Sequence, residues 1–181
     1  MSNHTTTPFS PSEWSFLASL LSLVAEQFSY KSCTDFTLDA SDDHKAIVAA
    51  AIERVGVAGD WGDEDASWQD YVADVMAADE QIVTFMDPMA DHLAARCHAI
   101  AAGESPAITT AELALIAEML SVAREDHDDA EALGLVPDAI ETTQENRAIL
   151  ARISSEDTRP PGQETRVPFK AALIHFEERC R

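Results

Sequence analysis

Lysine is scarce in this chain, with three lysines and nine arginines among 181 residues. Against these 12 bases stand 33 acids, which give a formal net charge of −21. Binding to phosphate needs clustered Lys and Arg, so the composition excludes nucleic acid and anionic membranes as direct partners. We therefore expect the partner to be a basic protein surface or a cation.

Cysteine, glycine and long apolar runs are also scarce. Three cysteines without paired spacing favour reduced thiols in a cytoplasmic protein. The apolar run "FLASLLSLVA" at 16–25 is too short to span a bilayer, and no basic segment precedes it as in a signal peptide. Six glycines and abundant alanine favour helix.

Several signatures of catalysis and cofactor binding are missing. The chain has no Gly-rich phosphate loop and no G-x-S-x-G motif. It also lacks the Glu-x-x-His pairs of di-iron bundles. Nothing near Cys33 in the sequence would clearly activate it as a nucleophile. We therefore expect a protein that is not an enzyme and holds no cofactor.

Helical signals run along the whole chain. Capping boxes start helices at Ser10 and Thr109, and apolar residues at helical spacing follow each of them. A further helix is expected from Ser67 to about Met86, with Asp79 inside its apolar stripe and in contact with His92 or Arg96. A helix is also expected from Pro137 to about Ile153. No strand pattern stands out, so the sequence predicts an all-α protein of six to seven helices.

Segments in the first half of the chain align with segments in the second half. "EWSFLASLLSLVA" at 13–25 aligns with "ELALIAEMLSVAR" at 112–124, "KAIVA" at 45–49 with "RAILA" at 147–151, and "HLAARC" at 92–97 with "HFEERC" at 175–180. Three landmarks in the same order predict an internal duplication of a helical unit, packed as one bundle-like domain. We expect a disordered N-terminus at 1–9, copy one at 10–103 and copy two at 104–181.

The two hexapeptides do not predict a metal site within one helix. His and Cys five positions apart lie about 140° apart around a helix axis, so they cannot bind the same ion. Cys97 and Cys180 fall on apolar seams and are expected in the core. Arg96 and Arg179 should each face a carboxylate of this acidic chain. A site between the copies that brings their histidines together remains an alternative.

The acids are unevenly distributed. Residues 55–95 contain ten acids and 125–146 contain eight, with no Lys or Arg in either range, and the acidic segment 59–81 is the part of copy one that copy two lacks. An uneven distribution of acids favours a binding face. Alternatives remain for the composition itself: a salt-adapted or structural protein would also have many acids, and a GC-rich genome would also give few lysines. The predicted partner-binding residues are Asp60, Asp63, Glu64, Asp65, Asp70, Asp74, Glu80, Glu125, Asp126, Asp128 and Asp129.

One alternative is a metal-dependent hydrolase. His127–Asp128 within "EDHDDAE" is an adjacent His-Asp pair, as in helical HD-type phosphohydrolases, and oxygen-rich clusters suit hard cations. The glycine of an EF-hand loop is missing, and the residues that flank the pair are acids rather than apolar. The other HD ligands would come from His92 or His98 upstream and Asp157 downstream.

A short segment has a resemblance of its own. "FSYKSCTDFTL" at 28–38 resembles an F-S-x-x-x-C-x-D-F-x-L signature of small helical proteins from phages and mobile elements, and "TQENRAIL" at 143–150 is similar to the segment that follows it. The resemblance implies no activity, and copy two lacks the Cys-x-Asp-Phe part. It does imply a mobile-element context, in which the acidic chain would inhibit a nucleic-acid-binding machine or act as an immunity protein against a toxin.

Overall fold

A computed structural model describes residues 8–29, 35–58, 68–137, 139–141 and 166–181. Within these residues the protein is mostly helical, as the sequence predicts, with seven helices and two small sheets of two strands each. The elements are α1 (Pro11–Ser29), β1 (Asp35–Asp39), α2 (Asp42–Ala58), α3 (Trp68–Ala77), β2 (Gln81–Phe85), α4 (Met86–Ala101), α5 (Thr110–Glu125), α6 (His127–Ala132), β3 (Ala139–Glu141), β4 (Arg166–Pro168) and α8 (Phe169–Cys180).

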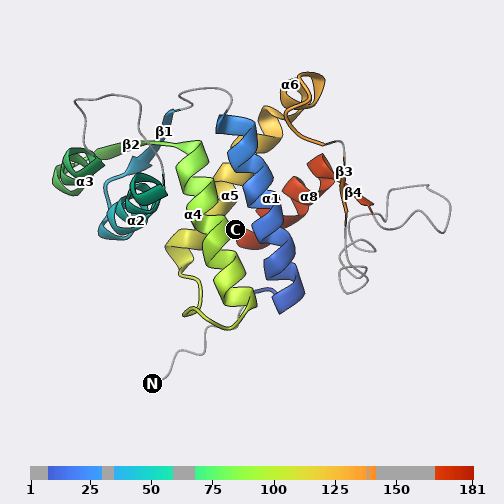
Figure 1. Cartoon of the computed structure of the whole chain (residues 1–181), viewed down its shortest axis with the longest axis horizontal. Coiled ribbons are helices and arrows are strands. Elements are labelled where there is room, and N and C mark those ends of the chain that lie inside the picture. The colour runs from blue at the N-terminus through green and yellow to red at the C-terminus, as the bar shows by residue number, and fades with distance from the viewer. Residues whose placement is uncertain (1–7, 30–34, 59–67, 138, 142–165) are drawn as a thin grey trace.

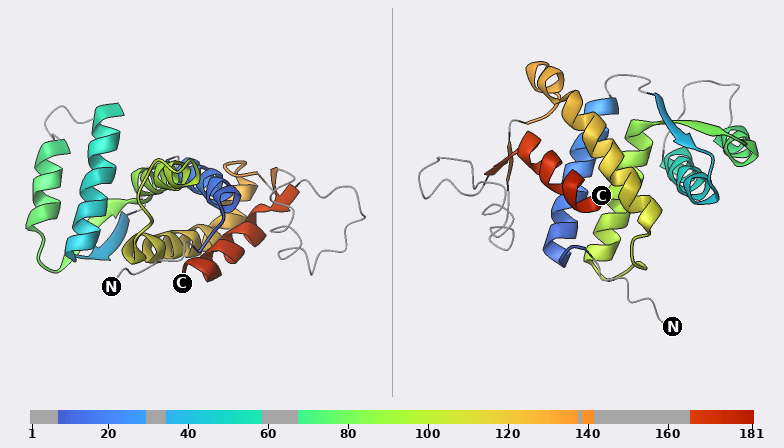
Figure 2. Two further views of the ribbon diagram at one scale, coloured as in Figure 1. Left: turned by 90° about the horizontal axis from the view of Figure 1, so that it is seen from below. Right: turned by 180° about the vertical axis from the view of Figure 1, so that it is seen from behind.

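Four helices form the centre of the molecule. Helix α1 packs along α4, and α5 packs along α8, so that the two pairs enclose one core (Figures 1 and 2). The fully buried side chains of this core come from all four helices. The largest are Trp14, Leu17, Leu20, Leu21, Met86, Met89, Leu93, Leu115, Phe169 and Phe176.

Both predicted capping boxes are present. Each has a short polar side chain just before the helix and a Glu at its third position. The backbone N–H of Ser10 donates to Glu13 at 2.7 Å, and that of Glu13 donates to Ser10 Oγ at 3.3 Å. At the start of α5 the backbone N–H of Thr109 donates to Glu112 at 2.8 Å, and that of Glu112 returns to Thr109 Oγ1 at 3.1 Å. Two acidic side chains are thereby fixed at helix N-termini, which favour negative charge.

An acidic lobe at one end of the molecule consists of β1, α2, α3 and β2 (Figures 1 and 2). Here the prediction of one helix from 67 to 86 is wrong. Helix α3 ends at Ala77, and β2 pairs antiparallel with β1, with Leu38 opposite Ile82 and Phe36 opposite Thr84. Strand β2 alternates between exposed and buried positions, which buries β-branched side chains against the core.

Asp79 does not lie on a helical stripe. It is exposed in the bend between α3 and β2, and Arg96, one of its two expected partners, bonds Glu112 and Ser105 instead. The bend forms because β2 must turn back to pair with β1, and the backbone N–H of Ala40 closes the end of this ladder on the carbonyl of Glu80 at 3.1 Å.

The opposite end of the molecule carries α6, β3 and β4 (Figure 1). The helix predicted from Pro137 does not begin there, because residues 139–141 pair as a strand with 166–168, Ile140 lying opposite Val167. The remainder of that predicted helix lies outside the described residues. A short strand places Ile140 in the core, where it is 8% exposed.

The predicted disordered segment at 1–9 extends too far. Phe9 is buried and meets Trp14 edge-to-face, with 4.8 Å between ring centroids. It also contacts Phe176 of α8 at 5.4 Å, so the hydrophobic effect holds this residue in the fold. Residues 1–7 lie outside the described residues.

Candidate functional site

The arginines of the two hexapeptides each face a carboxylate, as predicted. Arg96 on α4 donates to both carboxylate oxygens of Glu112, at 2.6 Å and 3.2 Å. Arg179 on α8 bonds Glu13 and also the carbonyl oxygen of Pro8, the latter at 2.6 Å. Each arginine thus binds the capping glutamate of the other copy, so the two contacts are equivalent in the sequence alignment. The two contacts have the reciprocity that a duplication would give, and the duplication itself stays a prediction.

These ion pairs set the ionisation of the two glutamates. Burial alone would raise the pKa of Glu112, but hydrogen bonds from Arg96 and from the backbone of Thr109 outweigh it and lower the pKa below its ordinary 4.5. Burial also acts to raise the pKa of Glu13, but hydrogen bonds from Ser10 and Arg179 outweigh it and lower this pKa. Both groups are therefore structural carboxylates that stay ionised.

The cysteines and histidines of the hexapeptides form no metal site among the described residues. Cys97 and Cys180 are buried, and burial raises the pKa of each thiol to about 12. Burial, followed by the nearby charge of Arg54, lowers the pKa of His92. Neither His92 nor His175 belongs to a potential ligand group in the described part of the chain. The expected core role of both cysteines is confirmed.

Of the eleven predicted partner-binding acids, seven are described by the structure, and these seven form two sets. Asp60, Asp63, Glu64 and Asp65 lie outside the described residues. Asp70, Asp74 and Glu80 are exposed on α3 and just after it, in the acidic lobe. Glu125, Asp128 and Asp129 are exposed at the end of α5 and on α6, and Asp126 is half-buried there. Because α3 and α6 lie at opposite ends of the molecule, the two sets do not form one face (Figure 1).

The acidic lobe holds few bases. The described residues of the lobe, 35–58 and 68–85 with the bend between α3 and β2 included, contain nine acids and two bases. Lys45 donates to the carbonyl oxygen of Met76 at 3.3 Å, and Arg54 pairs with Asp91 of α4 at 3.1 Å. Both bases are thus engaged in linking elements of the fold. Two apolar side chains, Met76 and Val83, are also exposed on this lobe, by 54% and 50%.

The acids around α6 are partly neutralised within the protein. Lys170 of α8 donates to both oxygens of Asp128, at 2.9 Å and 3.2 Å, and this hydrogen bond lowers the pKa of the Asp128 carboxyl. His127 is 5% exposed at its side chain, stacks on Phe169 and lies 3.3 Å from Glu131. This end of the molecule therefore offers a basic partner less free charge than the acidic lobe does.

The residues of the alternative metal site do meet. His127, Asp128 and Glu131 place one potential ligand atom each within 4.8 Å of one another. Lys170 occupies the Asp128 carboxylate, however, and no residue of α4 joins the group in the described part of the chain. Asp157, the downstream residue of the HD-type pattern, lies outside the described residues. The group could bind a cation only if the Lys170 ammonium left the Asp128 carboxylate.

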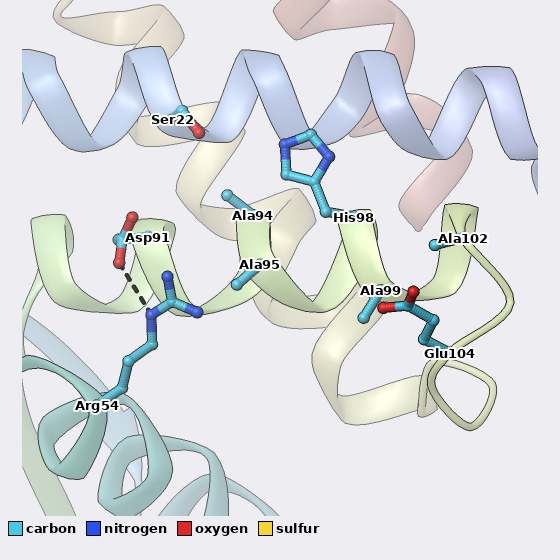
Figure 3. A pocket seen from close by; sticks show the side chains of 9 residues that line it. All are labelled: Ser22, Arg54, Asp91, Ala94, Ala95, His98, Ala99, Ala102 and Glu104. Atoms are coloured by element: carbon cyan, nitrogen blue, oxygen red, sulfur yellow. Dashed lines mark hydrogen bonds and ion pairs between the residues drawn. The ribbon is translucent and has the colours of Figure 1, made fainter.

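A groove that sequence reasoning missed runs between α1 and α4, next to the acidic lobe. Its volume is about 560 Å³. Asp91 and Arg54 stand at one end, His98 and Glu104 toward the other, and alanines of α4 form its floor (Figure 3). The lining residues are Ser22, Arg54, Asp91, Ala94, Ala95, His98, Ala99, Ala102 and Glu104. Alanines at helical spacing were the only signal in the sequence, and the same spacing is found in any packed helix.

Comparison with known proteins finds no matching family model, no matching curated protein and no matching solved structure. Among the described residues, no helix has the length and apolar character that crossing a membrane requires. Function must therefore be inferred from the charge and geometry of the chain itself.

Proposed function

We propose that the chain is a protein-binding module whose acidic lobe docks onto a basic surface, most suitably that of a nucleic-acid-binding protein that it inhibits. The observation that carries this proposal is the charge imbalance of the lobe, whose described residues contain nine acids and two bases. Such a field attracts basic partners and repels nucleic acid.

The exposed apolar side chains of the lobe add a reason for protein rather than small-cation binding. Interfaces gain most of their affinity from desolvated apolar contacts, while charge supplies rate and orientation. Met76 and Val83 lie on α3 and β2, among the acids Asp74, Asp79 and Glu80. This combination of acids and apolar side chains suits a partner that carries basic and apolar groups together.

The test measures competition with DNA. A sequence-nonspecific DNA-binding protein is loaded on fluorescent duplex DNA, and the chain is added at increasing concentration. We expect it to displace the DNA, and the effect should weaken above about 0.1 M salt because exposed charges are then screened within about 10 Å. The triple variant Asp74→Asn, Asp79→Asn, Glu80→Gln should compete at least about tenfold less well.

A matched control keeps the total charge equal. The variant Glu118→Gln, Asp129→Asn, Glu178→Gln removes the same three charges from exposed positions outside both the lobe and the groove. If both triple variants lose competition equally, net charge rather than the lobe is responsible, and the proposal fails. A purely salt-adapted protein would instead show no competition and a free energy of unfolding that rises strongly in molar salt.

The metal-dependent alternative has one observation in its favour, the proximity of His127, Asp128 and Glu131. Its test is elemental analysis of the purified chain, followed by titration with Zn²⁺ and Mn²⁺ monitored by calorimetry. Binding that is lost in His127→Ala and strengthened in Lys170→Ala would favour a metal site, because Lys170 competes for Asp128.

A further inference from the structure

The two copies differ at one seam, between the first and last helices of each copy. In the sequence alignment Ser22 corresponds to Ser121, Ala25 to Arg124, Ala94 to Glu177 and His98 to Arg181. The serine is the same in both copies. The other positions carry two arginines and a glutamate in copy two, and two alanines and a histidine in copy one.

In copy two this seam is filled from within. Glu177 is 7% exposed and binds two arginines at once. Arg124 Nε lies 3.0 Å from Glu177 Oε2, and Arg181 donates to Glu177 Oε1 at 2.8 Å. Arg124 also donates to Ser121 Oγ at 3.4 Å. Guanidinium groups therefore close the seam between α5 and α8.

In copy one the same seam is the groove of about 560 Å³ between α1 and α4 (Figure 3). Ala94 is buried where Glu177 stands in copy two, and Ser22 lines the groove with no arginine of the described residues bonded to its hydroxyl oxygen. The hydroxyl of Ser22 instead donates to the carbonyl oxygen of Ala18 at 3.1 Å. The groove thus corresponds in position to the charged side chains that copy two supplies.

An acid remains at the groove. Asp91 lies one helical turn before Ala94, on the same side of α4, and holds Arg54 through Oδ2 alone at 3.1 Å. Its Oδ1 makes no hydrogen bond among the described residues, so Asp91 binds one guanidinium where Glu177 binds two. Burial raises the pKa of the neighbouring Asp87, and the negative charge of Asp91 raises it further. Negative charge is therefore not fully compensated at this end of α4.

We infer that the groove of copy one accepts an arginine side chain of the basic partner. This arginine and Arg54 would both bind Asp91, in the way that Arg124 and Arg181 both bind Glu177 in copy two. The planar guanidinium can bind a carboxylate oxygen and a serine hydroxyl together, and its aliphatic stem can lie on the alanine floor. A lysine ammonium lacks the planar fork and is more strongly hydrated. The inference rests on the proposed function, and it adds a specificity for arginine that charge alone would not give.

The test uses two fluorescent peptides of equal length and charge, one rich in arginine and one rich in lysine. Binding to the full chain is measured by fluorescence anisotropy at low salt. We expect the arginine peptide to bind at least about fivefold more tightly, because only it makes the paired contacts to Asp91 and Ser22. Equal affinities would overturn the inference.

Two variants close the groove. The first, Ala25→Arg with Ala94→Glu, transfers the copy-two pair into copy one and leaves the net charge unchanged. The second, Ala99→Leu, fills the floor with an apolar side chain and serves if the first does not fold, as judged by circular dichroism. Both should reduce the binding of the arginine peptide to that of the lysine peptide. A preference for arginine that survives Ala99→Leu would refute the inference.

The controls separate this inference from the proposed function. Ala114→Leu makes the same substitution at an exposed position of α5 and should keep the preference. The triple variant Asp74→Asn, Asp79→Asn, Glu80→Gln should weaken the binding of both peptides to the same extent. If that variant changes nothing while the groove variants abolish the preference, the lobe is not the docking surface and the groove inference stands alone.

Discussion

Arg96 binds Glu112, and the bond joins the last helix of copy one to the first helix of copy two. Arg179 repeats the relationship in reverse by binding Glu13. Each of the two glutamates therefore caps a helix N-terminus and also binds an arginine from the other copy. Two corresponding ion pairs across the core are what a fused pair of equivalent units would have.

The first prediction concerns the stability of these connections. Arg96→Ala should lower the free energy of unfolding by about 3 kcal/mol, because Glu112 is 7% exposed at its side chain and would be left without its cation. Arg179→Ala should have a similar effect through Glu13. Urea denaturation followed by circular dichroism measures both.

The matched control is the exposed ion pair of Arg54 and Asp91, whose side chains are 45% and 50% exposed. Arg54→Ala should cost less than about 1 kcal/mol, because solvent screens such a pair. A cost for Arg96→Ala that is no greater than this would contradict the structural role assigned to the pair between the copies.

The second prediction follows from the lowered pKa values of Glu13 and Glu112. A carboxyl whose pKa is lower in the folded than in the unfolded state stabilises the fold above its unfolded pKa, and this stabilisation is lost as the pH falls through the folded pKa. The contribution should therefore be complete above about pH 5 and decline below the ordinary value of 4.5.

The measurement compares the free energy of unfolding at several pH values in the original chain and in Glu112→Gln. The variant should be less stable at neutral pH, and the difference should shrink as the pH falls from about 5 to about 3. Glu118→Gln, at an exposed position of the same helix, should follow the original chain throughout. A pH-independent difference in Glu112→Gln would show that ionisation of Glu112 is not what stabilises the fold.

Local signals of the sequence predict the helix starts and the seam cysteines well. A capping box needs residues only three positions apart, and an apolar seam repeats along a single helix, so both can be recognised without knowledge of the fold. The charge of the chain likewise predicts a carboxylate opposite each hexapeptide arginine. It does not predict which carboxylate, because Glu112 and Glu13 reach these arginines through the packing of helices from different copies.

Non-local pairing explains the errors. The sequence predicts a helix across β2 because Val75, Ile82 and Met86 also fit a helical stripe, whereas the pairing partner β1 lies more than 40 positions earlier. The β-branched run at 82–84 was the signal that favours a strand. The groove could not be predicted, since it depends on the space between α1 and α4 rather than on any residue pattern.

The third prediction concerns thiol reactivity. Cys97 and Cys180 are buried with pKa values raised to about 12, and a neutral thiol is a poor nucleophile. In a Cys33→Ser variant, iodoacetamide at pH 8 should therefore leave the native protein unmodified and should alkylate both remaining cysteines after unfolding. Mass spectrometry measures the modification. Alkylation of either cysteine in the native protein would show that its helix opens readily.

The last prediction concerns Thr84 on β2. Its side chain is fully buried, and its hydroxyl has no hydrogen-bond partner among the described residues. A buried hydroxyl without a partner is destabilising, so Thr84→Val, which keeps the shape and the β-propensity, should raise the free energy of unfolding by about 1 kcal/mol. Thr37→Val places the same change at an exposed position of β1 and should alter stability by less than about 0.5 kcal/mol. If Thr84→Val destabilises the protein instead, the hydroxyl is bonded in solution, and the inward face of this strand is more polar than its neighbours Ile82 and Phe36 indicate.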